Sequence, residues 1–600
     1  MELIEGRRPR ELRWYHAGAM LFGDWGTSRL YVLGLCFFYA RHASVWYMLA
    51  MSALLLGIGW AYQVICRLHP DGGGVYSSAR QRHPLLGMLG GLLLFADYTV
   101  TAAVSLVDAF HYLQLSPPHW WAVGCLVLLG LLNLFGPRKS GNGAVGVAVG
   151  AIVLTLIITL AALPAFAQVH VQPPEEGPVQ WWMHFTSIIL AISGVETIAN
   201  LTGIMVAPVE RTARRAILPV LLEIALLNVI LCVAMQAVPL EVLGNGDPSQ
   251  AYLAHRDDML RLLAEYYVGP IFAFVASTVF AFVLISAGNT AVAGLISIQY
   301  MMARDRELPP VFAGLNAFGV PVVALLLATL LPMVIVLLVP DMAGLADLYA
   351  MGVVGAVTIN LLTTATNFHL IISRRERAGL MLLGVLMALI AATIAWEKPH
   401  ALVFAGVITL GGFALRAVGK ARYLHQWWQR YRHVLLPHAI PPELKLPSVH
   451  PASGLAAKSL KGGPMLRILV ATRGGSRLLQ FALEEARNRQ AELFVLFVRQ
   501  LAVIPMGSVT VANIKDDEEA RLIFQQALQA AAEIQVPLRP LYAVGNDVAE
   551  IILELTVTYG VDLLIMGISQ RGRFWRLMKG DVIQQVAQYL PERTTLLIHA

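Results

Sequence analysis

Apolar stretches of membrane-spanning length recur along residues 17 to 418, and they constrain the fold more than any other feature. Each holds about twenty residues, the length that an α-helix needs to cross roughly 30 Å of hydrocarbon. Because no water reaches the backbone there, each stretch must form a helix that satisfies its own hydrogen bonds. We predict about twelve such helices: Ala17–Ala40, Val45–Cys66, Leu85–Leu113, Trp120–Leu134, Gly143–Phe166, Trp181–Val206, Ile217–Val238, Gly269–Tyr300, Val320–Val339, Met342–Ile372, Leu380–Trp396 and Ala401–Leu415.

The composition and the distribution of charge agree with an all-α membrane domain at residues 1–418. Hydrophobic residues make up 57% of the chain and charged residues only 14%, which lies outside the range of soluble domains. Basic residues collect in alternate loops, as they do on the cytoplasmic side, so we expect both termini to be cytoplasmic. The net charge of +6 is then an orientation signal, and we expect no nucleic-acid partner. The basic residues of these loops are Arg7, Arg8, Arg10, Arg13, Arg67, Arg80, Arg82, Arg138, Lys139, Arg211, Arg214, Arg215, Arg304, Arg306, Arg374, Arg375 and Arg377.

No part of the sequence has the spacing of a catalytic site or a metal site. The four cysteines, Cys36, Cys66, Cys125 and Cys232, fall in or beside apolar spans, which is typical of packing residues. The glycines of the C-terminal region do not form a Walker loop. The basic N-terminus leads into a full-length span, so we expect no cleavable signal peptide. We therefore expect a membrane protein without enzyme activity.

The composition changes after residue 418. Residues 419–464 combine a basic, aromatic segment with a run rich in Pro, Gly and Ser, which indicates a helix at the cytoplasmic membrane surface, or a plain connecting helix, followed by a linker. Residues 465–600 alternate short apolar runs with helical patterns, which predicts a soluble α/β domain with a parallel, doubly wound sheet. The predicted strands are 467–472, 492–498, 536–542, 562–567 and 594–599.

The C-terminal domain resembles the universal stress protein family, above all in Asp562-Leu-Leu-Ile-Met-Gly-Ile-Ser-Gln-Arg-Gly572. In nucleotide-binding members, a glycine-rich loop places the phosphates at the start of a helix. Gly567, Gly572 and Gly580 match these glycines, but Asp581 stands where such members have Ser or Thr. The resemblance implies either a bound nucleotide or a domain that serves regulation and forms a homodimer.

Glycines and polar residues interrupt two of the apolar spans. The first span contains Gly23-Asp-Trp-Gly-Thr-Ser28, and the sixth contains Ser193-Gly-Val-Glu-Thr-Ile-Ala-Asn-Leu-Thr-Gly203. Broken helices expose free amides and carbonyls at the middle of the membrane, where ions and substrates bind. Five spans separate the two breaks, so they occupy matching positions if the first ten spans form an inverted repeat. Asp24 is costly at membrane depth, which makes it a candidate for a functional site.

Residues 1–418 resemble the amino acid–polyamine–organocation superfamily. The segment Asp71-Gly-Gly-Gly-Val-Tyr-Ser-Ser-Ala-Arg80 is similar to a cytoplasmic loop of the superfamily. The segment Ser193-Gly-Val-Glu-Thr-Ile-Ala-Asn200 is similar to its sixth helix. The resemblance implies a secondary transporter with a LeuT-type fold, in which five helices and the next five form an inverted repeat.

The first break bears on the substrate. Amino-acid carriers of the superfamily generally have a Gly-Ser-Gly-type turn there, whose amides receive the substrate carboxylate. Here Asp24 supplies a carboxylate, with Thr27, Ser28 and Tyr31 close by. A fixed anion among hydroxyl and carbonyl oxygens favours a hard monovalent cation and repels a substrate carboxylate. The motif Gly-Asp-x-Gly-Thr-Ser-x-Leu-Tyr is also similar to the first-helix motif of the KUP potassium-uptake family.

Three further segments resemble the KimA branch of potassium and proton symporters. They are Asp97-Tyr-Thr-Val-Thr-Ala-Ala-Val-Ser105, Ser193-Gly-Val-Glu196 and Leu348-Tyr-Ala-Met-Gly352. That branch also carries a stress-protein-like cytoplasmic domain. The resemblance implies proton coupling through Asp24, Asp97 and Glu196. It also implies a potassium site formed by Asp24, Thr27, Ser28, Tyr31, Thr101, Ser105, Ser193 and Tyr349.

The leading hypothesis is proton-coupled potassium uptake across the cytoplasmic membrane of a prokaryotic cell, with potassium and protons as transported ions and no resident cofactor. The alternative is a proton-coupled amino-acid transporter. Arg29 bears on this choice, because an inward-facing guanidinium would neutralise Asp24. Alternatively, the carboxylates inside the spans pair with neighbouring groups and stabilise the fold, and the hydroxyl side chains pack between helices. A third hypothesis, a membrane-anchored sensor that transports nothing, is disfavoured by the paired helix breaks.

Overall fold

The computed structural model describes residues 10, 12–72, 74–135, 141–169, 171–316, 318–420, 466–474, 476–501, 514, 517–545, 547–567 and 582–599. These residues fall into two compact units, one from residue 10 to 420 and one from residue 466 to 599. The predicted interfacial helix and linker at 419–464 lie outside the described residues, apart from residues 419 and 420, which end the last helix of the first unit.

The N-terminal unit is built from helices joined by turns and loops. Its long helices occupy the apolar stretches that the sequence marks as spans. In chain order its helices are α1 (Trp14–Leu21), η1 (Phe22–Gly26), α2 (Ser28–Ala40), η2 (Arg41–Ala43), α3 (Ser44–Leu68), α4 (Val75–Arg82), α5 (Pro84–Tyr112), α6 (Pro118–Asn133), α7 (Gly141–Ala162), η3 (Leu163–Gln168), α8 (Pro178–Ser187), η4 (Ile189–Ile192), α9 (Thr197–Leu201), η5 (Thr202–Ile204), α10 (Val209–Gln236), α11 (Leu240–Leu243), η6 (Pro248–Gln250), α12 (Met259–Tyr267), α13 (Pro270–Arg304), η7 (Pro310–Ala313), α14 (Val322–Leu338), α15 (Met342–Thr366), α16 (Arg374–Glu397) and α17 (Pro399–Lys420).

Within the described residues, eight helical segments are long and apolar enough to cross a membrane. A bent pair, Pro178–Ser187 with Ile189–Ile204, raises that number to nine, and its two parts meet at 48°. Two shorter apolar helices, α6 and α14, hold 16 and 17 residues. The N-terminal unit is thus a helical membrane region, as the sequence predicts.

Local sequence signals set the starts of several helices. Pro84, Pro118 and Pro270 stand in the first turns of α5, α6 and α13, where a missing backbone N–H costs nothing. A capping box starts α16, in which the Glu376 backbone N–H donates to Ser373 Oγ over 3.2 Å and the Ser373 backbone N–H donates to Glu376 Oε2 over 3.1 Å. Such signals fix helix starts that the apolar pattern leaves open by several residues.

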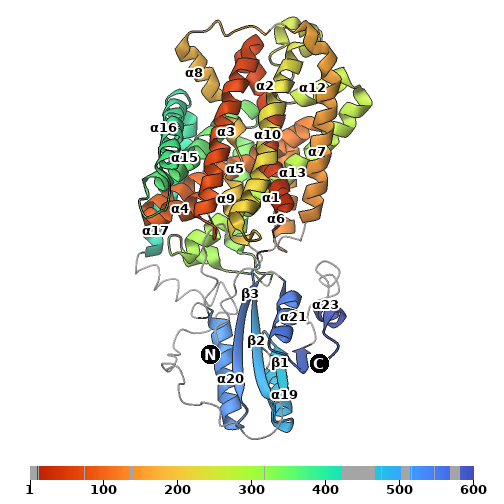
Figure 1. Cartoon of the computed structure of the whole chain (residues 1–600), viewed down its shortest axis with the longest axis vertical. Coiled ribbons are helices and arrows are strands. Elements are labelled where there is room, and N and C mark those ends of the chain that lie inside the picture. Colours follow the sequence, from red (N-terminus) through yellow and green to blue (C-terminus); the bar gives the residue numbers. More distant parts are fainter. Residues whose placement is uncertain are drawn as a thin grey trace. The chain divides into compact units, whose positions relative to one another are not determined.

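Helix α5 lies at the centre of the helical unit and is buried along most of its length. It packs against α13 and α15, while α3 packs against α10, and Figure 1 shows α3 and α10 running alongside each other. Large apolar side chains are exposed on outer helices, for example Phe274 on α13, Leu382 on α16 and Leu410 on α17. Apolar surface of this extent matches a lipid environment rather than water.

The C-terminal unit is a five-stranded parallel sheet in the order β3-β2-β1-β4-β5. Leu483 and Phe524 join α19 and α20 to the core on one face, and Ile552 and Val586 join α21 and α23 to the core on the other. The predicted parallel α/β fold is therefore confirmed. Its elements are β1 (Arg467–Ala471), α19 (Ser476–Asn488), β2 (Glu492–Gln500), α20 (Glu518–Glu533), β3 (Leu538–Gly545), α21 (Val548–Thr558), β4 (Leu563–Gly567), α23 (Val582–Tyr589) and β5 (Thr595–His599).

The prediction for the third strand is wrong at both ends. The apolar pattern predicts residues 536–542, but β3 spans Leu538–Gly545. Val536 belongs to the turn after α20, because its backbone N–H donates to the Ala531 carbonyl oxygen over 3.0 Å. At the other end β3 stays paired with β2 up to Gly545 opposite Gln500. The length of the neighbouring strand, which a local pattern cannot encode, sets the end of β3.

Candidate functional site

The first predicted break lies between α1 and α2. Residues Phe22–Gly26 form a π-helical turn, and α2 starts after it at Ser28. Gly23 and Gly26 flank Asp24 in this turn, and glycine tolerates irregular backbone. The Asp24 side chain is 4% exposed. The break therefore places a carboxylate inside the helical unit.

The second predicted break lies between α8 and α9. Gly194 follows η4 and has a φ of +87°, in the left-handed region that glycine adopts without strain. A Cβ atom on Gly194 would stand 2.6 Å from the Trp25 backbone nitrogen and 2.7 Å from the Asp24 carbonyl carbon. Both the backbone conformation and the space thus require a glycine where the second break meets the first.

Hydrogen bonds join the two breaks. Trp25 Nε1 donates to the Ala191 carbonyl oxygen over 3.2 Å. Thr197 Oγ1, at the start of α9, donates to Asp24 Oδ2. A side chain of the second break therefore holds the carboxylate of the first. Thr197 is missing from the predicted site residues, although it lies within the second interrupted motif.

Thr27 and Ser28, two predicted ion ligands, bond to backbone carbonyl groups of the first break. Thr27 Oγ1 donates to the Asp24 carbonyl oxygen over 2.8 Å, and Ser28 Oγ donates to the Trp25 carbonyl oxygen over 2.7 Å. These bonds use the hydroxyl protons and leave the oxygen lone pairs able to accept. The role of these two hydroxyls as ligands stays a prediction.

Arg29 is paired with α10 and not with Asp24. Its side chain is 2% exposed and forms an ion pair with Glu223 through Nη2. Its Nε donates to the Gly26 carbonyl oxygen over 3.2 Å. Because Glu223 balances the guanidinium charge, Asp24 has no cationic side chain beside it among the residues that the structure describes.

Two further carboxyl groups, Asp97 on α5 and Glu196 at the start of α9, lie within electrostatic range of each other. Both are buried, and Asp24 interacts electrostatically with each. Neither Asp97 Oδ2 nor Glu196 Oε2 receives a hydrogen bond from a described residue. Because neighbouring like charges repel each other in a buried place, a proton on one of the two carboxyl groups is favoured. The arrangement thus suits the uptake and release of a proton inside the helical unit.

Tyr349 on α15 and Tyr31 on α2 lie within electrostatic range of these carboxyl groups. Tyr349 interacts with Asp24, Asp97 and Glu196, and Tyr31 interacts with Asp24 and Asp97. A buried polar atom without a partner costs about 1–3 kcal/mol, so a cluster of them marks a place for an ion or water. The atoms of this kind in the cluster are Asp97 Oδ2, Ser193 Oγ, Glu196 Oε2, Asn200 Oδ1 and Tyr349 OH.

The remaining predicted residues of the membrane site lie on α5. Thr101 Oγ1 donates to the Asp97 carbonyl oxygen over 2.9 Å, and Ser105 is buried one turn further along the same face. Helix α15 approaches α5 here at Gly352, where a Cβ atom would stand 2.7 Å from the Asp97 backbone nitrogen. This close approach explains a glycine in the predicted motif at 348–352.

The buried cluster does not line the open cavity beside α8. Asp24, Asp97 and Glu196 are at most 4% exposed. The cavity, about 660 Å³ in volume, is lined by residues of α2, α8, α15 and α16 and includes none of the three carboxyl groups. The described conformation is therefore occluded around Asp24.

The predicted nucleotide site cannot be built from the described residues. Gly567 is the last residue of β4, at the carboxyl end of the sheet. Gly572 and Gly580, and Asp581 beside them, lie outside the described residues. The nucleotide site stays a prediction.

His69 directly follows the last residue of α3, and its side chain has an unusual pKa. Its carbonyl oxygen accepts a hydrogen bond from Thr202 Oγ1 over 3.0 Å. Burial lowers the pKa of His69 from its ordinary value of 6.5 to about 4. Above pH 6.5 the His69 imidazole is neutral in both the folded and the unfolded chain. As the pH falls from 6.5 toward 4, the unfolded chain binds the proton first, so the fold loses stability.

We expect this loss to be at most about 3 kcal/mol by pH 4. The measurement is the unfolding temperature of the purified protein between pH 7 and pH 4, compared with His69→Gln. The wild type should lose more stability on acidification than the variant does. The matched control is His400→Gln, at an exposed histidine, which should follow the wild type. Parallel pH curves for wild type and His69→Gln would contradict the expectation.

The comparisons with known proteins divide the chain at the same place as the structure. Residues 13–414 match the amino acid permease family, and residues 465–595 match the universal stress protein family. A solved universal stress protein in complex with cAMP is similar over 23% of this chain and 98% of its own, at 20% identity and a TM-score of 0.18.

Two curated relatives are similar to part of this chain. The potassium transporter KimA of Bacillus subtilis is 23% identical over 295 residues, which is 45% of this chain and 46% of that protein. The probable potassium transport system protein Kup 2 of Aeromonas hydrophila is 27% identical over 237 residues, 33% of this chain and 38% of that protein. The chain therefore spans less than half the length of these relatives.

Proposed function

Since this chain belongs to the amino acid permease family over residues 13–414, we propose that its membrane region is a secondary active transporter that takes up potassium ions together with protons. The observation that carries the proposal is the placement of Asp24. A buried carboxylate stands where two broken helices meet, and the nearest arginine along the chain, Arg29, is paired elsewhere. A fixed negative charge of this kind attracts a cation.

The chemistry of the surrounding groups supports potassium. Hard monovalent cations bind carboxylate, hydroxyl and carbonyl oxygens. The hydroxyl groups of Thr27 and Ser28 contact backbone carbonyl oxygens of the break that carries Asp24, and Tyr31 and Tyr349 lie within electrostatic range of Asp24. The curated relatives that are similar to part of the chain are named as potassium transporters. The ion ligands in this proposal are Asp24, Thr27, Ser28, Tyr31, Thr101, Ser105, Ser193 and Tyr349.

The carboxyl pair supports coupling to protons. Asp97 and Glu196 are buried within electrostatic range of each other, and both interact electrostatically with Asp24. Like charges in such a place favour the binding of a proton, and a cation arriving at Asp24 reduces the negative potential at the pair, which favours release of that proton. Asp97, Glu196 and Asp24 are the coupling residues in this proposal.

The proposal includes twelve membrane crossings. The segment Trp14–Leu68 holds 55 residues, and a continuous helix of that length would be about 80 Å long, more than twice the hydrocarbon thickness. The turn η2 separates the segment into two crossings, and η1 is a break inside the first of them. Together with the bent pair and the shorter helices α6 and α14, the count reaches twelve. One broken helix then falls in each half of a LeuT-type inverted repeat.

The proposal for the rest of the chain follows from the two family matches. The domains are the transporter at 1–418, an interfacial helix and linker at 419–464, and a cytoplasmic universal-stress-protein-like domain at 465–600. The basic loops support cytoplasmic termini, and the bacterial relatives support the inner membrane. The C-terminal domain regulates transport, forms a homodimer and can hold a nucleotide near Gly567.

A second candidate function is proton-coupled amino-acid transport. The matched family is named for amino acid permeases, and Gly194 gives the second break an irregular backbone. The carboxylate of Asp24 opposes this candidate, since it would repel the substrate carboxylate.

Uptake into proteoliposomes separates the two candidates. Full-length protein is reconstituted, and the uptake of radioactive rubidium is measured with excess potassium or with a mixture of the common amino acids as competitor. We expect potassium to compete and the amino acids to have no effect. Uptake of labelled amino acids without rubidium uptake would replace the potassium proposal with the amino-acid one.

A further inference from the structure

Helix α5 carries a continuous polar face through the centre of the helical unit. Asp97, Thr101, Ser105, Asp108 and Tyr112 follow one another at spacings of four or three residues, which places them on one face of the helix. All five are buried. At about 1.5 Å per residue, Asp108 lies roughly 16 Å along the helix from Asp97. Asp108 is therefore too far from the carboxyl pair to belong to it.

Asp108 is a buried carboxyl group that has no hydrogen-bond partner among the residues that the structure describes. Its side chain has no solvent exposure, and neither of its two carboxylate oxygens accepts a hydrogen bond from a described residue. A carboxylate in this situation is expensive unless a positive charge or a proton neutralises it. Among the described side chains, no positively charged group contacts either Asp108 carboxylate oxygen.

The charged groups that face Asp108 are acidic. Asp108 interacts electrostatically with Asp257 and Asp258, from the loop before α12. Asp108 also interacts with Tyr31 on α2 and with Tyr112, one turn along its own helix. No facing group therefore supplies a compensating positive charge.

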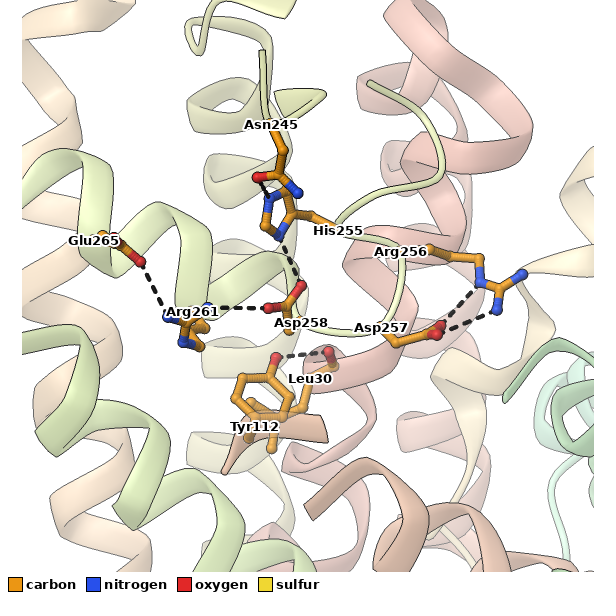
Figure 2. A network of polar contacts seen from close by, with 9 residues as sticks. All are labelled: Leu30, Tyr112, Asn245, His255, Arg256, Asp257, Asp258, Arg261 and Glu265. Carbon is orange, nitrogen blue, oxygen red and sulfur yellow. Dashed lines mark hydrogen bonds and ion pairs between the residues drawn. The ribbon is translucent and has the colours of Figure 1, made fainter. Parts of the chain in front are cut away.

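The arginines of the loop before α12 and of the first turn of α12 are already paired with other side chains (Figure 2). The Arg256 guanidinium donates to Asp257 over 2.9 and 3.2 Å, and Arg261 donates to Asp258 over 3.3 Å. His255 Nδ1 lies 2.8 Å from Asp258 Oδ1. Arg256 and Arg261 thus pair with carboxylates other than Asp108.

The same loop is fixed against α2 beside the polar face of α5. A Cβ atom on Gly34 of α2 would stand only 2.0 Å from the Arg256 carbonyl oxygen. Below the loop in Figure 2, Tyr112 OH donates to the Leu30 carbonyl oxygen over 2.8 Å. Leu30 precedes Tyr31, which interacts with both Asp108 and Asp24. Tyr31 therefore lies within electrostatic range of both Asp108 and the proposed ion site.

We infer that Asp108 forms a second binding site for a monovalent cation, separate from the site at Asp24 and between it and the loop that carries Asp257 and Asp258. The inference rests on the proposed potassium function. The acidic loop raises the local cation concentration, and the unpartnered carboxylate holds one ion before it moves along the face of α5 toward Asp24.

Binding of radioactive rubidium to purified full-length protein at equilibrium tests this inference. Asp108→Asn should bind one rubidium ion fewer per chain than the wild type, and Asp24→Asn should also bind one fewer. Asp347→Asn, at a carboxylate paired with Lys398 over 2.6 Å on another part of the unit, is the matched control and should bind as the wild type does. Wild-type stoichiometry in Asp108→Asn would overturn the inference and leave the site at Asp24 standing. Loss of an ion in Asp108→Asn but not in Asp24→Asn would support the inference and contradict the proposed function at Asp24.

A second measurement needs no variant at all. A hydrophobic carbodiimide reacts with protonated carboxyl groups, and mass spectrometry of the labelled wild type reports modification at Asp108. We expect rubidium to slow this labelling several-fold and choline to have no effect. Labelling that is insensitive to rubidium would mean that a proton alone neutralises Asp108, and the inference would be wrong.

Discussion

Asp24→Asn should lower rubidium uptake into proteoliposomes by at least about 100-fold. The variant keeps the shape of the side chain and an oxygen that accepts the Thr197 hydroxyl, so the contact between the two breaks survives. It removes the fixed negative charge, and losing a charged contact worth about 3 kcal/mol corresponds to roughly 100-fold in binding. The measurement is the initial rate of uptake at a rubidium concentration below saturation.

Asp347→Asn is the control for this variant, because it makes the same chemical change at a carboxylate with 36% side-chain exposure. It should transport at the wild-type rate. Uptake by Asp24→Asn within a few-fold of the wild type would remove the observation on which the potassium proposal depends.

Arg29→Met should destabilise the protein by about 3 kcal/mol or more. The substitution leaves the Glu223 carboxylate, which is 15% exposed, without its ion-pair partner, and breaking a largely buried pair from one side is strongly destabilising. The double variant Arg29→Met with Glu223→Met removes both charges and should recover most of the loss. Thermal unfolding of the purified variants measures the difference.

The same double variant tests whether Arg29 has a part in ion selection. Since its charge is balanced on α10, the double variant should still take up rubidium and ignore amino acids. If Arg29→Met is as stable as the wild type, the ion pair does not contribute to the stability of the fold. Amino-acid transport by the double variant would show that Arg29 acts on the site after all.

The sequence predicts both helix breaks because their cause is local. Glycines and polar residues inside an apolar stretch disfavour a continuous membrane helix whatever the rest of the chain does. For the same reason the strands and helices of the C-terminal unit follow from alternating patterns, although some observed ends differ from the predicted ones. The turn after α20 sets the start of β3, and the pairing of β2 with β3 carries both strands beyond their predicted ends. The cost of a carboxylate at membrane depth also singles out Asp24 without any knowledge of its surroundings.

The partners of the buried groups could not be predicted, because they come from distant parts of the chain. The direction of Arg29 depends on Glu223, which is 194 residues away. Thr197 reaches Asp24 across 173 residues. Asp108 carries a local signal, its spacing from Ser105 and Tyr112 on one helix face, but the absence of any partner emerges only when the surrounding helices are packed.

We propose that a proton gradient drives potassium, or rubidium in its place, into the cell. The most direct test loads proteoliposomes with the same rubidium concentration inside and outside and then imposes an inward proton gradient of about one pH unit, worth about 1.4 kcal/mol. We expect rubidium to accumulate inside above the outside concentration, and we expect a protonophore or Glu196→Gln to abolish the accumulation. Rubidium that stays equal on both sides, although it exchanges freely, would contradict proton coupling, because the transporter would then move the ion without coupling it to protons.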